Sequence, residues 1–202
     1  MILLVRHGET DGNAKRVLQF PDTPLSERGH AQAARLAERL KGAPIGGLLA
    51  SDYARAQQTA EAVRAVTGAT LTLDPGLRER HFGELRGRAY ADLETDPFAP
   101  DYHPPGGESW EELHARVDAV WERVIAAASR TEGHLVVVTH GLVCHSLFSR
   151  VLDLGDAVAP RGLGNTALTE IDPRPPFRVE RVGCTAHLDA ATAHDDRTVS
   201  GL

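Results

Sequence analysis

The chain has 202 residues, with 42% hydrophobic and 25% charged residues, a composition typical of a globular domain that can bury a full core. The formal net charge is −6 and no run of basic residues stands out, so we expect neither nucleic acid nor a membrane as a partner. The first apolar run is too short for a signal peptide, and Cys144 and Cys184 are typical of reduced thiols, so we expect a cytoplasmic protein.

Strand-like and helix-like segments alternate along the chain. Apolar runs predict strands at 2–5, 47–51, 71–73, 135–138, 166–171 and 177–182. Helical periodicity and caps predict helices that begin near residues 26, 53, 109 and 142. This alternation predicts a single α/β domain, a three-layer α/β/α arrangement around a largely parallel sheet. We expect the domain to span 1–185 and a loosely ordered tail to span 186–202.

Some finer features are also expected from the pattern. Residues 12–24 are polar and predict a loop over the site, and the four prolines within 96–107 predict a loop or lid. The buried face of the second helix is expected to comprise Ala56, Ala60, Val63 and Val66.

Two of the predicted strands end in a histidine followed by glycine, at His7 and at His140. In open α/β sheets, ligands bind beyond the carboxyl ends of the strands, where Arg6 and Arg55 are also expected to lie. A histidine that is largely neutral at pH 7 can attack a phosphoryl group, so His7 is the candidate nucleophile. Taken alone, a histidine at a strand end also fits a purely structural role.

The sequence contains no motif for nucleotide-dependent or metal-dependent phosphoryl transfer. There is no Walker-type loop, no HExxH and no Cys-x-x-Cys, and the ten histidines lack metal-ligand spacing. We therefore expect no metal and no cofactor, and the positive charge that phosphoryl transfer requires would come from side chains.

Four motifs occur in order between residue 2 and about residue 145. They are Arg6-His7-Gly8-Glu9-Thr10 with Asn13 and Leu25-Ser26-Glu27-Arg28-Gly29, then Ser51-Asp52-x-x-Arg55, Leu77-Arg78-Glu79 and Val138-Thr139-His140-Gly141. Together they resemble the motifs of the histidine phosphatase (phosphoglycerate mutase-like) superfamily. The resemblance implies a phosphoglycerate mutase-like fold and a reaction that passes through a phosphohistidine intermediate.

The resemblance also implies roles for individual residues. His7 would be phosphorylated during turnover, and Arg6, Arg55 and His140 would surround the phosphate. Asn13 and Gln19 would donate hydrogen bonds to it. Glu79 would be the proton donor, which requires a raised pKa; without the motif, it would be read as one arm of a surface ion pair. Glu9 is interpreted as a structural carboxylate.

Three functions fit these motifs: a phosphatase, a 2,3-bisphosphoglycerate-dependent mutase, and a non-catalytic module that binds phosphorylated ligands. Mutases of the family resemble each other in a longer insertion with a lysine after the acid, whereas this chain has 140 − 79 = 61 residues and no lysine there. The resemblance therefore favours a metal-independent phosphomonoester hydrolase.

The substrate is expected to contact segments 13–22 and 90–108. Candidate contacts are Phe20, Arg86, Tyr102 and His103. Few apolar side chains are expected near the site, so a small, polar phosphorylated metabolite is the expected substrate. The sequence makes no prediction of oligomeric state.

Overall fold

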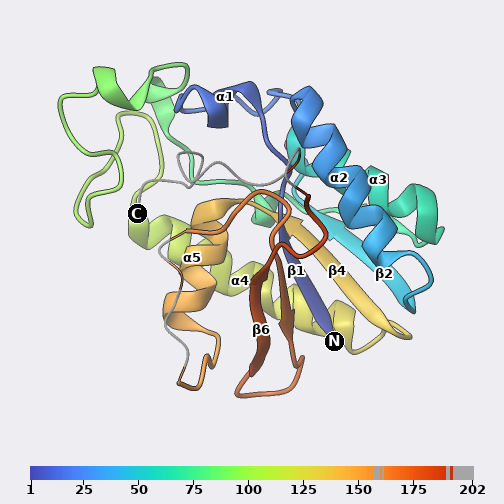
Figure 1. The fold of residues 1–202 in the computed structure, drawn as a ribbon. Coiled ribbons are helices and arrows are strands. Elements are labelled where there is room, and N and C mark those ends of the chain that lie inside the picture. The colour runs from blue at the N-terminus through green and yellow to red at the C-terminus, as the bar shows by residue number, and fades with distance from the viewer. Residues whose placement is uncertain (157–159, 161, 190–191, 193–202) are drawn as a thin grey trace.

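The computed structural model describes residues 1–156, 160, 162–189 and 192. A six-stranded sheet lies at the centre, with helices packed on both sides (Figure 1). The strands are β1 (Ile2–Arg6), β2 (Ile45–Ala50), β3 (Leu71–Leu73), β4 (His134–Thr139), β5 (Leu168–Ile171) and β6 (Val179–Cys184). The α-helices are α1 (Asp11–Ala14), α2 (Glu27–Leu40), α3 (Ala54–Thr67), α4 (Trp110–Ala128) and α5 (Gly141–Arg150). The predicted single-domain α/β class is confirmed.

The strand order is β3-β2-β4-β1-β5-β6, so the first and fourth strands of the chain are neighbours at the centre of the sheet. Strands β3, β2, β4 and β1 are parallel, whereas β5 and β6 pair antiparallel. In the register of β1 and β4, Arg6 lies opposite Thr139. The residues that follow, His7 and His140, therefore leave the sheet side by side.

Alternation along the central strands produces two apolar cores. Leu3 and Val5 of β1 pack in the core with α2 and α3. Ile2 and Leu4 point to the opposite face, in the core with α4 and α5. Because both faces of the sheet are covered, the central strands are apolar throughout, which is why they read as uninterrupted hydrophobic runs.

Three helix ends lie at capping residues that the sequence indicates. Ser26 accepts a hydrogen bond from the Gly29 amide at the start of α2, and Ser109 forms a capping box with Glu112 at the start of α4. Helix α3 ends at Gly68, whose φ of 70° is left-handed and is adopted by glycine at little cost.

Three expectations differ from the structure or extend beyond it. The expected loop at 12–24 begins inside α1, which forms because Thr10 and Asn13 exchange side-chain and backbone hydrogen bonds. Val66 is 41% exposed, because it lies on the solvent side of α3, and does not belong to the core. Most of the predicted tail lies outside the described residues, but His187 and Asp189 contact the domain through Thr166 and Arg35.

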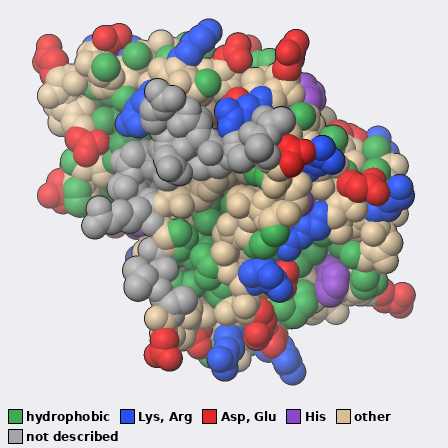
Figure 2. Space-filling model, in the orientation of Figure 1, with side chains coloured by type: hydrophobic (Ala, Val, Ile, Leu, Met, Phe, Trp, Pro, Cys, Tyr) green, Lys and Arg blue, Asp and Glu red, His purple; other side chains and the backbone are tan. Residues whose placement is uncertain are grey.

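The surface carries charges of both signs. On the face shown in Figure 2, acidic and basic side chains are interspersed around the outline. Within the described residues, none of the helices combines the length and the apolar character of a membrane span.

Candidate active site

A cavity opens at the carboxyl edge of the sheet, where β1 ends. It is lined by Arg6, His7, Asn13, Val17, Leu18, Gln19, Tyr53, Arg55, Glu79, Arg80, Phe82, Tyr90, Phe98 and Leu142. Its volume is about 40 Å³. This volume is the space open to the centres of water-sized spheres, and one water molecule requires roughly 10–15 Å³ of it. The cavity therefore accommodates a group of phosphoryl size.

The imidazole of His7 is held in one orientation at the end of β1. Its Nδ1 lies 2.7 Å from the carbonyl oxygen of Gly8, which can only accept, so Nδ1 carries the proton. The backbone of His7 is fixed on both sides, by its amide donating to Thr139 O (2.9 Å) and by Asn165 Nδ2 donating to its carbonyl (3.0 Å). The Nε2 lone pair is therefore the nucleophilic position.

Arg55 approaches that lone pair from α3. Its Nε donates to His7 Nε2 at 3.3 Å, and its Nη1 donates to the carbonyl of Phe20 at 3.1 Å. Thr59, one turn later on α3, accepts a hydrogen bond from Gly8 N (3.0 Å) and donates to Arg55 O (2.7 Å). One helix turn thus positions both the arginine and the loop that carries the nucleophile.

The two buried guanidinium groups and the burial of the ring keep His7 neutral. Burial, together with Arg55 and Arg6, holds the pKa of His7 well below its usual value. Burial lowers the pKa of Arg55 to about 10 and also lowers the pKa of Arg6. Arg6 is held in place by donating to the carbonyl of Leu163.

His140 lies next to His7. The two ring centroids are 5.0 Å apart, and His140 Nε2 lies 2.8 Å from the hydroxyl of Ser51, which follows β2. The His140 side chain is fully buried and is not among the residues that line the cavity. Burial and Arg55 hold its pKa well below the usual histidine value.

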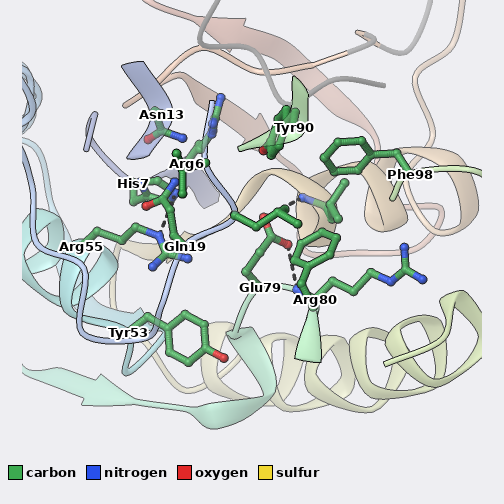
Figure 3. Close-up of a pocket in the computed structure, with 14 residues that line it drawn as sticks. Arg6, His7, Asn13, Gln19, Tyr53, Arg55, Glu79, Arg80, Tyr90 and Phe98 are labelled. Atoms are coloured by element: carbon green, nitrogen blue, oxygen red, sulfur yellow. Dashed lines mark hydrogen bonds between the residues drawn. The ribbon is translucent and has the colours of Figure 1, made fainter. Parts of the chain in front are cut away.

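Asn13 and Gln19 also line the cavity. The Oδ1 of Asn13 accepts from the Thr10 amide (3.2 Å), so its Nδ2 is the end that can donate to a ligand. The Oε1 of Gln19 accepts from the Thr10 hydroxyl (2.8 Å), so its Nε2 can likewise donate to a ligand. Figure 3 shows both side chains near Arg6 and His7.

Glu79 faces this cluster from the other side of the cavity (Figure 3). Its Oε1 accepts from the amide of Arg80 (3.0 Å) and its Oε2 from the amide of Leu142 in the first turn of α5 (3.3 Å). The nearby arginines and these amides favour the carboxylate, but burial outweighs them and raises the pKa of Glu79. The structure therefore brings a neutral imidazole and a carboxyl group with a raised pKa to opposite sides of one cavity.

An aromatic wall completes the cavity on the side of Glu79. It consists of Phe82, Tyr90 and Phe98, and the Phe98 ring centroid lies 5.8 Å from that of Phe82 and 5.3 Å from that of Tyr90. The expectation that few apolar side chains lie near the site is wrong, because the proline-rich segment folds back and carries Phe98 inward. Nothing in the local pattern of that segment indicates which side chain points inward.

The four candidate substrate contacts are not among the residues that line this cavity. Phe20 is 50% exposed and contributes its carbonyl to Arg55. Arg86 donates to the hydroxyl of Tyr53 (2.8 Å), a residue that does line the cavity. Tyr102 and His103 lie in the proline-rich segment, where the Tyr102 carbonyl accepts from Arg80. In the described part of the chain, no three His, Cys, Asp or Glu side chains form a group that could hold a metal ion.

Comparison with known proteins places this geometry in a family. Residues 2–182 match the family model described as histidine phosphatase superfamily (branch 1). A relative from Enterobacter sp. strain 638, named probable phosphoglycerate mutase GpmB, is 35% identical over 94% of this chain and 95% of the relative. A relative of the same name from Proteus mirabilis is 36% identical over 85% of this chain and 84% of the relative.

Solved structures with the same fold include proteins that are not named as phosphoglycerate mutases. Bacillus stearothermophilus YhfR superposes with a TM-score of 0.79 and 30% identity, over 92% of this chain and 98% of that one. A mycobacterial glucosyl-3-phosphoglycerate phosphatase superposes with a TM-score of 0.75 and 27% identity, over 90% and 97%. The match to the family model extends over nearly the whole sequence, and the chain therefore belongs to the histidine phosphatase superfamily, branch 1.

Proposed function

We propose that this protein is a phosphomonoester hydrolase that acts on a small phosphorylated metabolite through a phosphohistidine at His7. The observation that carries the proposal is the hydrogen bond between His7 Nδ1 and the Gly8 carbonyl. It fixes the tautomer in which the Nε2 lone pair faces the cavity, next to Arg55 and opposite Glu79.

In the first step, the phosphate of the substrate takes over the guanidinium groups of Arg6 and Arg55. The Nε2 lone pair of His7 forms a bond to phosphorus, and the bond from phosphorus to the ester oxygen breaks. Glu79, as the carboxylic acid, gives its proton to the departing oxygen. The fixed positive charge stabilises the equatorial oxygens as the transfer proceeds.

In the second step, the same groups act in reverse. The Glu79 carboxylate removes a proton from water, the resulting hydroxide bonds to phosphorus, and the bond from phosphorus to Nε2 breaks. Inorganic phosphate leaves, His7 regains its lone pair and Glu79 regains its proton. We assign Asn13 and Gln19 to donate to the phosphate, and the neutral ring of His140 to pack beside the ring of His7 and hold it in place.

The size and lining of the cavity bear on the substrate. A volume of about 40 Å³ fits the phosphoryl group and leaves the rest of the substrate to extend along the wall of Phe82, Tyr90 and Phe98. The name of the mycobacterial neighbour supports hydrolysis of a phosphorylated metabolite, and the names of the curated relatives support a second candidate, a phosphoglycerate mutase.

Two measurements test the proposal. The first is release of inorganic phosphate from p-nitrophenyl phosphate and a panel of phosphorylated metabolites, with His7→Ala as the inactive control. The second is rapid quenching under alkaline conditions, which preserves a phosphohistidine, followed by mapping of the labelled residue. Turnover without an adduct at His7 would contradict the mechanism.

One further assay separates hydrolase from mutase. 3-Phosphoglycerate is incubated with and without 2,3-bisphosphoglycerate, and both the isomer and inorganic phosphate are measured. A hydrolase releases phosphate and forms little isomer under either condition. Isomerisation that depends on the bisphosphate and exceeds phosphate release would favour the mutase. Equal inactivity of the wild type and His7→Ala would favour a module that only binds the ligand.

A further inference from the structure

Arg80 is a buried cation that the proposed chemistry does not use. Arg80 directly follows Glu79 in the sequence, and it is only 1% exposed. In Figure 3 the guanidinium of Arg80 extends away from His7 and the phosphate cluster. Burying a guanidinium is costly unless its donors are satisfied, so its partners indicate what it is for.

Within the described residues, the Arg80 side chain donates three hydrogen bonds, each to a backbone carbonyl of the same segment. Nε donates to Glu108 O (2.8 Å), Nη1 to Pro97 O (3.1 Å) and Nη2 to Tyr102 O (2.5 Å). The guanidinium also lies 4.5 Å from the ring centroid of Trp110, whose Nε1 donates to Ala99 O (2.9 Å). One planar group thus joins the beginning, the middle and the end of segment 97–108.

That segment has little other regular structure to hold it. Between Tyr90–Asp92 and α4 the structure contains no helix or strand in residues 93–109, all of which it describes. Its last part is tied by the amide of Glu108 to His81 O (2.7 Å) and by the amide of Glu84 to Pro105 O (3.0 Å). The carbonyls of Pro97 and Tyr102, in the part that carries Phe98, are held by Arg80.

The backbone of the same residue holds the acid. The amide of Arg80 donates to Glu79 Oε1 at 3.0 Å, while its side chain fixes the segment that places Phe98 against Phe82 in the cavity wall. A displacement of segment 97–108 would therefore pull on the residue adjacent to the carboxyl group.

We propose that Arg80 is a positioning residue that ties segment 97–108 to Glu79, so that the aromatic wall and the proton donor keep a fixed relation. The part of this proposal that concerns catalysis rests on the proposed role of Glu79. The anchoring itself depends on the shape of the guanidinium, because a lysine ammonium keeps the charge but cannot direct donors at three separated carbonyls in one plane.

The test compares Arg80→Lys and Arg80→Gln with a matched control, Arg88→Lys, which changes an exposed arginine whose side chain donates to Asp92 O (2.9 Å). Hydrogen–deuterium exchange of residues 93–108 measures the anchoring without reference to activity. We expect both Arg80 variants to exchange on the order of tenfold faster there, and the control to match the wild type.

Kinetics measure the link to the acid. Glycerol 3-phosphate has a poor leaving group that requires protonation, whereas p-nitrophenyl phosphate does not. We expect both Arg80 variants to lose on the order of 10² in kcat for the alkyl ester and less than about tenfold for the aryl ester. KM should rise for both substrates, because the wall that Phe98 completes is no longer fixed.

Several results would overturn the proposal. Wild-type exchange in Arg80→Lys would mean that charge is sufficient and the three carbonyls are not needed. Faster exchange with an unchanged ratio of alkyl to aryl kcat would mean that Arg80 anchors the segment but does not position Glu79. If the wild type forms no phosphohistidine, the proposed function fails, but the exchange measurement still decides the anchoring.

A second variant covers the case in which the Arg80 variants do not fold. Trp110→Leu removes the ring under the guanidinium and the hydrogen bond to Ala99 O, and its folding is checked by circular dichroism. We expect the same two changes at smaller size. Wild-type exchange and kinetics in that variant would contradict the proposal.

Discussion

The sharpest test of the candidate site is the replacement Arg55→Gln. The side chain of Arg55 is 2% exposed and its Nε lies 3.3 Å from the proposed nucleophilic nitrogen. With a pKa of about 10, only about one molecule in a thousand lacks the charge at pH 7. The wild type therefore presents a full positive charge to the phosphoryl group of the proposed reaction.

The size of the loss follows from that charge. Removing one fixed donor to a developing oxyanion costs about 2.7–4 kcal/mol, so kcat/KM should fall on the order of 10²–10³. The matched control is Arg64→Gln on the same helix, because Arg64 is exposed and pairs with its helix neighbour Glu61. Its kcat/KM with p-nitrophenyl phosphate should stay within about twofold of the wild type.

The same substitution has a second effect, of known sign. Arg55 disfavours the imidazolium and is one cause of the lowered pKa of His7, so its removal should raise that pKa. Because attack requires neutral His7, the acid limb of kcat/KM should move to higher pH. A loss smaller than about tenfold, or an acid limb that stays in place or moves to lower pH, would refute the role assigned to Arg55.

Further predictions concern the acid, the second histidine and one close backbone contact. Burial raises the pKa of Glu79, so activity should be lost as pH rises through that value; Glu79→Gln should lose this alkaline limb and affect alkyl phosphates more than aryl phosphates. The pKa of His140 is lowered by burial, so its contribution to stability is present above about pH 6.5 and is lost as pH falls. In urea unfolding at about pH 7 and about pH 5, His140→Gln should therefore reduce the loss of stability by up to about 2 kcal/mol, and an unchanged difference would contradict this. At Gly29, a Cβ would lie 2.0 Å from the carbonyl oxygen of Glu9, so Gly29→Ala should lower the free energy of unfolding by about 1–3 kcal/mol or more; wild-type stability would disprove the contact.

Much of the fold follows from local patterns. The runs at 2–5 and 135–138 are apolar on both faces, and this indicates central parallel strands before any contact is known. Because such strands end at a common edge, the positions of His7 and His140 could be predicted together. The register that places Arg6 opposite Thr139 could not, since it depends on pairing between distant segments.

The other side of the cavity was not predictable in the same way. Segment 96–107 has four prolines and no periodicity, so its sequence does not indicate that Phe98 turns inward or that its carbonyl groups accept hydrogen bonds from Arg80. Val66 fits the apolar stripe of α3 but lies on the exposed side of the helix. Helix α1 begins with a capping box whose third residue is Asn13 instead of the usual Glu or Gln, which hides the signal.

The pairing of β1 has a consequence for biosynthesis. Strand β1, which leads into His7, is synthesised before its neighbours in the sheet, β4 and β5, and before Asn165, which donates to the His7 carbonyl. At about 5–20 residues per second, the N-terminal strand waits on the order of ten seconds for these partners. Chains released before residue 165 are therefore expected to carry the histidine without the surroundings that the proposed reaction requires.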